Sequence, residues 1–150
     1  MVQTHSLGRA GEDLISDLLQ VRGWQLLARN WRRRSAELDL VMCRGEQILF
    51  VEVKTRRCTR AADDLAQLLS WRKQQILLRS VQAFLKVEQP TSYTTYRLYL
   101  AVVIAKACNA PLITWFPLEI DGERASELSQ ANFHNEKTPP SSAGYFSRSR

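Results

Sequence analysis

Cysteine and histidine are both scarce in this chain, and their positions exclude two common kinds of site. The three cysteines are Cys43, Cys58 and Cys108, an odd number without a CxxC spacing. The two histidines, His5 and His134, stand far apart in the sequence. Neither a disulfide framework nor a Cys/His zinc site fits this pattern, so we expect free thiols in a reducing compartment.

Long apolar runs are also absent. The longest, Leu98–Ala105, is far shorter than the roughly 20 residues that a membrane-spanning helix needs. The N-terminus has no basic segment followed by an apolar core, so we do not expect a secretion signal. The sequence lacks a Walker loop, a GxGxxG motif, a serine-nucleophile elbow and an internal repeat. These absences favour a cytoplasmic protein without a membrane contact.

Positive charge is what the chain has in excess. The net charge is +6 and the isoelectric point is about 9.6, which favours a polyanionic partner. Arginines concentrate in two segments that we expect to be loops, residues 29–34 and residues 56–60. Both segments flank the acidic stretch described next, so we expect them to form one basic rim around it. The alternative is a solvated charge run that only keeps the protein soluble.

A short turn around Gly45 separates two segments with the character of strands, residues 35–42 and residues 48–54. A tight hairpin loop at this turn places Asp39 opposite Glu52. Facing side chains have Cβ atoms about 4.5–5.5 Å apart, where like charges repel each other. The two facing carboxylates therefore predict a bound divalent cation.

The same register places Glu37 opposite Lys54, so all four charges share one face of the hairpin. The other face is wholly apolar and consists of Leu38, Leu40, Met42, Leu49, Val51 and Val53. The charged face is also apolar near the turn, so we expect a hairpin inside a sheet that is covered on both sides. Buried carboxylates are costly unless they are paired or bind a metal. The alternative is a plain Glu37–Lys54 ion pair with two solvated acids beside it.

Hydrophobic periodicity predicts an α/β fold with a mixed sheet. We expect a folded domain over residues 1–120, a C-terminal extension over 121–136 with room for a short helix, and a disordered tail over 137–150. Glu12 and Asp13 are expected in the first turn of the first helix, where the helix dipole favours acidic residues. The expected elements are a helix over 8–22, strands over 24–28, 35–42, 48–54, 96–104 and 112–116, and helices over 62–88 with a break near Ser70.

A series of short motifs resembles one family of small proteins. The motifs are Gly8–Glu12, Gly23-Trp24, Arg29–Arg32, Glu37–Leu40 and Phe50–Arg56. Together they resemble the YraN-like family of predicted endonucleases over residues 7–116. This family belongs to the PD-(D/E)XK superfamily and is similar to archaeal Holliday-junction resolvases. The chain departs from the family pattern at Ala36, where glycine is usual, and at Tyr99, where the family commonly has aspartate.

The resemblance implies a restriction-endonuclease-like α/β/α sandwich and a metal-dependent catalytic site. It assigns Asp39 and Glu52, with the Val53 carbonyl, to a Mg²⁺ or Mn²⁺ ion. Lys54 would position or help deprotonate the attacking water and stabilise phosphate charge. Glu12 is similar to the family's accessory acid and would bind a second cation through water, although it could equally be a simple helix acid.

Further residues would support this site or its substrate. Glu37 would pair with Lys54, and Gln74 would orient a water or a phosphate unless it is a plain surface residue. Trp31 would stack on an unpaired base, although a core position is the more common role for tryptophan. The residues expected to contact phosphates without reading sequence are Arg32, Arg33, Arg34, Arg56 and Arg57.

The implied activity is hydrolysis of phosphodiester bonds in nucleic acid by an endonuclease, with DNA favoured over RNA. No base-reading helix is recognisable, so we expect recognition of a branched or single-stranded structure. A homodimer would suit two nicks on a symmetric substrate. Two alternatives remain open: a non-catalytic nucleic-acid-binding module with the nuclease fold, and a basic structural protein whose carboxylates only form ion pairs.

Overall fold

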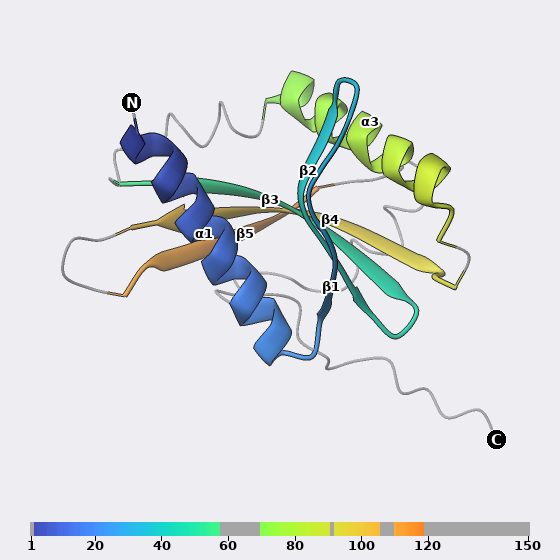
Figure 1. Ribbon diagram of the computed structural model, residues 1–150, viewed down its shortest axis with the longest axis horizontal. Helices are drawn as coiled ribbons and strands as arrows, with labels where there is room; N and C mark the ends of the chain where they lie inside the picture. The colour runs from blue at the N-terminus through green and yellow to red at the C-terminus, as the bar shows by residue number, and fades with distance from the viewer. Residues whose placement is uncertain (1, 58–69, 91, 106–109, 119–150) are drawn as a thin grey trace.

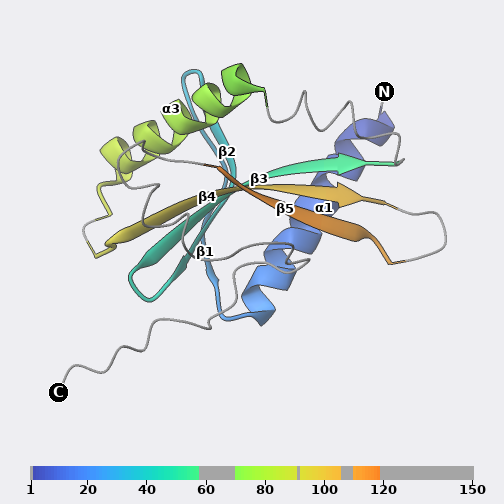
Figure 2. The ribbon, with the colours of Figure 1, turned by 180° about the vertical axis from the view of Figure 1, so that it is seen from behind.

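The computed structural model describes residues 2–57, 70–90, 92–105 and 110–118. These residues form a five-stranded sheet in the order β1-β2-β3-β4-β5, in which only β3 and β4 run parallel. One helix lies on each face of the sheet (Figures 1 and 2). The elements are α1 (Val2–Val21), β1 (Gln25–Arg33), β2 (Ala36–Arg44), β3 (Gln47–Arg56), α3 (Trp71–Glu88), β4 (Thr95–Ile104) and β5 (Leu112–Leu118). The predicted α/β/α sandwich with a mixed sheet is confirmed.

The core has two main clusters, one under each helix. On the α1 face of the sheet, Ile15 and Leu19 pack against inward residues of the central strands such as Val51. On the α3 face, Leu77 and Phe84 pack against another set of strand residues. A sheet covered on both faces requires strands that are apolar on both sides, as the sequence of the β2–β3 hairpin predicted. No helix in the described part of the chain is long and apolar enough to cross a membrane.

Helix α1 is longer than the sequence suggested. It begins at Val2 and ends before Gly23, whose φ of 85° is a conformation that glycine adopts at little cost. Glu12 therefore lies in the middle of the helix, and the expectation that it occupies the first turn is wrong. A dipole effect at the helix start does not explain this acid.

Helix α3 begins after Ser70 and ends where Gln89 adopts a left-handed conformation, one residue before Pro90. The predicted break near Ser70 therefore coincides with the start of this helix. The rest of the expected helical segment, residues 62–69, lies outside the described residues. So do the C-terminal extension at 121–136 and the tail at 137–150.

The register of the β2–β3 hairpin agrees with the prediction near the turn and departs from it further away. Five facing pairs run from Arg44–Gln47 to Leu40–Val51, as predicted. Beyond Leu40 the two strands separate: β2 continues beside β1, whereas β3 continues beside β4. Figure 1 shows the paired β1 and β2 strands turning toward α3 while the end of β3 points away from them.

Side-chain alternation is interrupted in β1 and β2 at the level where the strands separate. Leu38 and Val41 both pack in the cluster under α3, although Leu40 packs under α1. Residues 39 and 40 therefore both serve the α1 face, and the prediction that Leu38 shares a face with Leu40 is wrong. Asn30 lies across from this point on β1 and has a left-handed φ of 49°. Such a conformation rotates the strand locally, and asparagine tolerates it better than most residues.

Candidate active site

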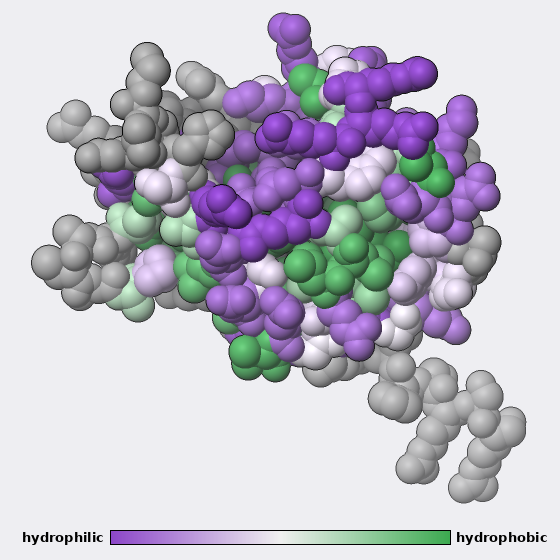
Figure 3. All heavy atoms as spheres, viewed as in Figure 1, coloured by the Kyte–Doolittle hydropathy of each residue, from purple (hydrophilic) through white to green (hydrophobic). Residues whose placement is uncertain are grey.

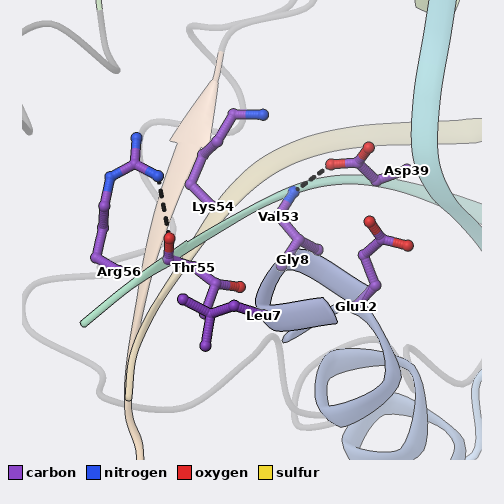
Figure 4. A pocket seen from close by; sticks show the side chains of 8 residues that line it. All are labelled: Leu7, Gly8, Glu12, Asp39, Val53, Lys54, Thr55 and Arg56. Carbon is purple, nitrogen blue, oxygen red and sulfur yellow. Dashed lines mark hydrogen bonds between the residues drawn. The ribbon is translucent and has the colours of Figure 1, made fainter. Parts of the chain in front are cut away.

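The separation of β2 and β3 opens a cavity of about 290 Å³ beside helix α1. Its walls come from the first half of α1, from β2 and from the carboxyl half of β3 (Figure 4). The lining residues are Leu7, Gly8, Glu12, Asp39, Val53, Lys54, Thr55 and Arg56. Five of the predicted site residues, Glu12, Asp39, Val53, Lys54 and Arg56, thus surround one small space, whereas Glu52 is not among the lining residues.

Asp39 occupies the point where the two strands part. Its Oδ2 atom accepts a hydrogen bond of 2.7 Å from the backbone N–H of Val53. This side-chain contact bridges β2 and β3 just beyond the last backbone pair. Asp39 is only 8% exposed. Burial, the charge of Glu52 and a hydrogen bond with the Glu52 carboxyl group together raise the pKa of Asp39 to about 6. The hydrogen bond from Val53 lowers this pKa but does not outweigh them.

Glu52 approaches Asp39 closely enough for the two carboxyl groups to interact. Its side chain is 14% exposed and forms an ion pair with the ammonium group of Lys54, two residues along the same strand. The two acids do not face each other in a regular ladder, because the strands have separated at this level. Alternation along β3 places Glu52 on the α3 face with Phe50, and Glu52 does not line the cavity; its carboxyl group interacts with Asp39 where the strands part.

Lys54 is one-third exposed and carries a firmly held positive charge. Burial alone would lower the pKa of Lys54, but the neighbouring Glu52 and Asp39 carboxylates outweigh burial and raise this pKa above its usual value. Lys54 is therefore an ammonium group at neutral pH. It is suited to stabilise negative charge on a phosphate, whereas accepting a proton from water would first require it to lose its own.

The backbone of Val53 also faces this space. In extended structure, the N–H and C=O groups of one residue point to the same side of the strand. Since the Val53 N–H points to Asp39, its carbonyl oxygen faces the same gap. Two carboxylates and one carbonyl form a set of hard oxygen ligands, which fits Mg²⁺ or Mn²⁺. Within the described ranges, no group of three or more His, Cys, Asp or Glu side chains is placed to hold a metal ion, so the candidate ligands here are two acids and one backbone carbonyl.

Glu12 enters the cavity from α1, and its carboxylate points toward Asp39 in Figure 4. Its Oε2 atom accepts a 3.1 Å hydrogen bond from Asn30 Nδ2 and lies 3.5 Å from Arg29 Nη2. Arg29 also forms a 2.6 Å ion pair with Asp13. The break of alternation in β1 directs both Arg29 and Asn30 toward α1, so the same irregularity positions Asp39 and the partners of Glu12.

A close helix–strand contact brings Glu12 to this position. A Cβ atom added at Gly11 would lie 1.9 Å from Thr55 Oγ1, so a larger residue would force Thr55 or the helix to move. The Thr55 hydroxyl is buried and has no hydrogen-bond partner among the described residues. The sequence analysis missed Gly11, Thr55 and Asn30. A glycine inside an apolar helical pattern was the one available signal, since such a glycine often marks a close packing contact.

Several predicted supporting residues have other contacts. Glu37 pairs with Arg32 at 2.6 Å, so the predicted partnership of Glu37 with Lys54 is wrong. Trp31 packs edge-on against Phe84, with ring centroids 5.3 Å apart, which matches the alternative of a core tryptophan. Gln74 lies in the first turn of α3 and does not line the cavity.

The two arginine clusters do not form one rim. Residues 29–33 belong to β1 and not to a loop, and Arg34 lies in the turn that follows. The β1–β2 hairpin carries its tip toward α3, away from the end of β3 at Arg56, which Arg57 follows (Figure 1). Arg56 alone among these arginines lines the cavity, and its Nη1 donates a 3.0 Å hydrogen bond to the Thr55 carbonyl. The expectation of a single basic rim is therefore wrong.

Comparison with known proteins places this arrangement in a family. The model of a family described as "Uncharacterised protein family UPF0102" matches residues 11–104, a range that holds Glu12, Asp39, Glu52 and Lys54. A "UPF0102 protein" of Synechococcus sp. (strain JA-3-3Ab) is 39% identical over 98 residues, which cover 65% of this chain and 75% of the relative.

Two further relatives carry the same description. The protein of Stutzerimonas stutzeri (strain A1501) is 44% identical over 86 residues, which cover 57% of this chain and 71% of the relative. The protein of Treponema pallidum (strain Nichols) is 42% identical over 79 residues, which cover 53% of this chain and 62% of the relative. The family model covers α1 from residue 11 onward and strands β1 to β4.

Proposed function

The chain belongs to the UPF0102 family, and we propose that it is a metal-dependent endonuclease that hydrolyses phosphodiester bonds of nucleic acid. The observation that carries this proposal is the convergence of Asp39 and Glu52, with Lys54 beside them, where β2 and β3 separate. Burial and the neighbouring Glu52 carboxylate raise the pKa of Asp39, and structural ion pairing alone explains such a pair of acids poorly. A divalent cation between them would relieve their repulsion.

We call the place where Asp39, Glu52, Val53 and Lys54 meet the notch. Each residue around it has a proposed role in hydrolysis. Asp39, Glu52 and the Val53 carbonyl would hold Mg²⁺ or Mn²⁺, which lowers the pKa of a bound water and neutralises oxygen charge when present. Lys54 would turn from Glu52 to a phosphate oxygen and stabilise its charge. Arg56, at the cavity wall, would hold a neighbouring phosphate. Glu12 would accept a hydrogen bond from a water that hydrates a second cation.

The proposal extends to the substrate that the resemblance implies. We infer DNA in preference to RNA and recognition of a branched or single-stranded form in the cytoplasm. A homodimer would present two such notches to a symmetric substrate. The opening between diverging strands supports access by a backbone phosphate.

The test is a substrate panel with matched variants. Duplex, flap, four-way junction and single-stranded DNA, with RNA counterparts, are incubated with the protein in Mg²⁺, Mn²⁺ or EDTA. We expect metal-dependent cleavage of at least one substrate, reduced by about 100-fold or more in Glu52→Gln and in Asp39→Asn, since each variant loses one of the two charged ligands that hold the metal. Asp17→Asn changes an exposed acid of α1 and should cleave normally.

The outcomes separate the proposal from its alternatives. Cleavage that persists in Glu52→Gln would exclude this mechanism. Binding of the panel without cleavage in any metal would favour a non-catalytic nucleic-acid-binding module. If the protein neither binds nor cleaves any substrate, the carboxylates have only a structural role and the proposal is overturned.

A further inference from the structure

Helix α3 presents a strongly basic outer face that the proposed catalytic notch does not use. Its inward residues, including Leu77 and Phe84, are buried against the sheet. Its single acidic residue, Glu88, accepts a 3.0 Å hydrogen bond from Trp31 Nε1. The exposed cations of this face are Arg72, Lys73, Arg79 and Lys86. Among the described residues, none of these four cations forms an ion pair.

Ion pairs neutralise some basic side chains elsewhere in the described part of the chain, but none on this face. Arg29, Arg32 and Lys54 each contact a carboxylate within 3.5 Å or less. The outer face of α3 therefore keeps a net positive charge that the protein itself does not neutralise. A polyanion is the partner that such a face fits.

The spacing of the cations suits an extended polyanion. Arg72, Arg79 and Lys86 follow one another at intervals of seven residues, so they form one line along the helix. At a rise of 1.5 Å per residue, this line is about 21 Å long. A nucleic acid strand that advances about 3.4 Å per nucleotide would cover it in roughly six steps.

An exposed aromatic ring stands at the start of the same helix. Trp71 is 76% exposed and directly precedes Arg72 and Lys73. A large exposed ring beside cations is well placed to stack on an unpaired base. Every base has a flat aromatic face, so this stacking does not depend on sequence. Trp31, by contrast, packs against Phe84 in the core. Trp71 therefore has the free ring that the sequence analysis sought at Trp31.

The position of α3 connects this face to the notch. Leu77 and Phe50 pack in one cluster, and alternation along β3 places Glu52 and Lys54 on the same face of the sheet as Phe50. In Figures 1 and 2 the N-terminal end of α3 lies nearer than its other end to the place where β3 ends. A strand that follows α3 toward Trp71 would therefore approach the diverging strands.

The tip of the β1–β2 hairpin extends the basic face. The backbone N–H of Glu37 donates a 3.2 Å hydrogen bond to Ser80 Oγ and fixes the hairpin to α3. The exposed Arg33 and Arg34 lie at this tip. Figure 3 shows strongly hydrophilic side chains gathered over α3 and the hairpin tip.

We propose that the outer face of α3 binds the sugar–phosphate backbone of a nucleic acid and that Trp71 stacks on an unpaired base. Arg72, Arg79 and Lys86 contact phosphates about three nucleotides apart without reading sequence. The inference rests on the proposed function because it names the surface that delivers the substrate to the notch. Its ligand class is nucleic acid with at least one unpaired base.

The test measures binding without cleavage. Fluorescence anisotropy follows a labelled oligothymidine of about 20 nucleotides, longer than common site sizes, in EDTA over a range of salt concentrations. The triple variant Arg72→Ala, Arg79→Ala, Lys86→Ala should have a log–log salt slope shallower by about 2, since each single-strand phosphate contact contributes about 0.7. Trp71→Ala should weaken binding by about tenfold or more, and Trp71→Phe should restore most of it.

Controls make each outcome decisive. Gln82→Ala removes an exposed neutral side chain of α3 and should bind as the wild type does. If the triple variant does not fold, the single variants should each reduce the slope by about 0.7. An unchanged slope, an equal affinity of Trp71→Ala, or equal competition by polyglutamate would overturn the proposed surface. Because EDTA prevents cleavage, failure here leaves the test of the nuclease proposal intact.

Discussion

At the residue scale, the surroundings of Asp39 have opposing effects on its protonation state. Its carboxylate accepts a hydrogen bond from Val53, which favours the charged form, yet it is buried beside Glu52, which favours the protonated form. The net result is a pKa of about 6 in the folded, metal-free protein, against 3.8 ordinarily. Two carboxylates that bind a cation should repel each other when no cation is present, which makes the charged state of Asp39 unfavourable.

This raised pKa predicts how stability changes with pH. The folded protein binds the Asp39 proton more tightly than the unfolded chain, so stability falls as pH rises from about 4 to about 6 and the penalty is complete above that window. Asp39→Asn should therefore raise the melting temperature in EDTA at pH 7.5 by several degrees, an effect on the order of 1–3 kcal/mol. The difference should shrink toward pH 4. Calorimetry at both pH values measures it, and a lower melting temperature for Asp39→Asn at pH 7.5 would contradict the assignment.

Gly11 has the most demanding steric environment of the described glycines. Alanine is the better helix former by about 1 kcal/mol, but its Cβ would meet Thr55 Oγ1 at 1.9 Å. Gly11→Ala should therefore destabilise the protein by about 1–3 kcal/mol and displace Glu12 from the cavity. Urea unfolding measures the change.

Gly8 supplies the matched control for this substitution, because nothing lies within 4 Å of a Cβ added there. Gly8→Ala should be neutral or stabilising. Combining Gly11→Ala with Thr55→Ala should restore part of the lost stability, since the closest clashing atom is then absent. Equal stability of Gly11→Ala and the wild type would show that α1 does not depend on this contact.

At the scale of elements, the break of alternation in β1 and β2 creates the site. Asn30 adopts its left-handed conformation across from Asp39, and both strands then present two successive residues to the α1 face. The Asn30 side chain also donates to Glu12. One backbone irregularity thus aims acids from two different elements into one cavity.

Two substitutions separate the backbone role of Asn30 from its side-chain role. Asn30→Ala loses the hydrogen bond and places alanine in a left-handed conformation, which costs about 1–2 kcal/mol. Asn30→Gly loses the same hydrogen bond but tolerates the backbone. In urea, the free energy of unfolding should be similar for the wild type and Asn30→Gly and clearly lower for Asn30→Ala. Equal losses for the two variants would indicate that the hydrogen bond, and not the backbone conformation, dominates.

Elements differ in how far their sequence could predict them. The register near Gly45 followed from alternation and from the glycine turn, and the five observed pairs agree with it. The separation beyond Leu40 depends on which neighbour each strand prefers, and local sequence does not contain that information. The Asn30 conformation depends on contacts with α1, so the local sequence could not predict it either.

At the scale of the whole molecule, the α/β/α arrangement could be predicted because both faces of the central hairpin are apolar. The distribution of charge over the surface could not. Arginines close in sequence to the acids were assigned to one rim, but the diverging strands separate them. The basic face of α3 draws on cations that are seven residues apart, a pattern visible only once the helix has a known buried side.

We propose that Asp39 and Glu52 share one divalent ion at the place where β2 and β3 separate. The most direct measurement is Mn²⁺ binding followed by electron paramagnetic resonance, with the wild type, Asp39→Asn, Glu52→Gln and the control Asp17→Asn. We predict that the wild type and Asp17→Asn bind Mn²⁺ with equal affinity and that both site variants lose at least about tenfold, because each loses a charged oxygen ligand. Unchanged Mn²⁺ affinity in Asp39→Asn and Glu52→Gln would contradict the proposed metal site.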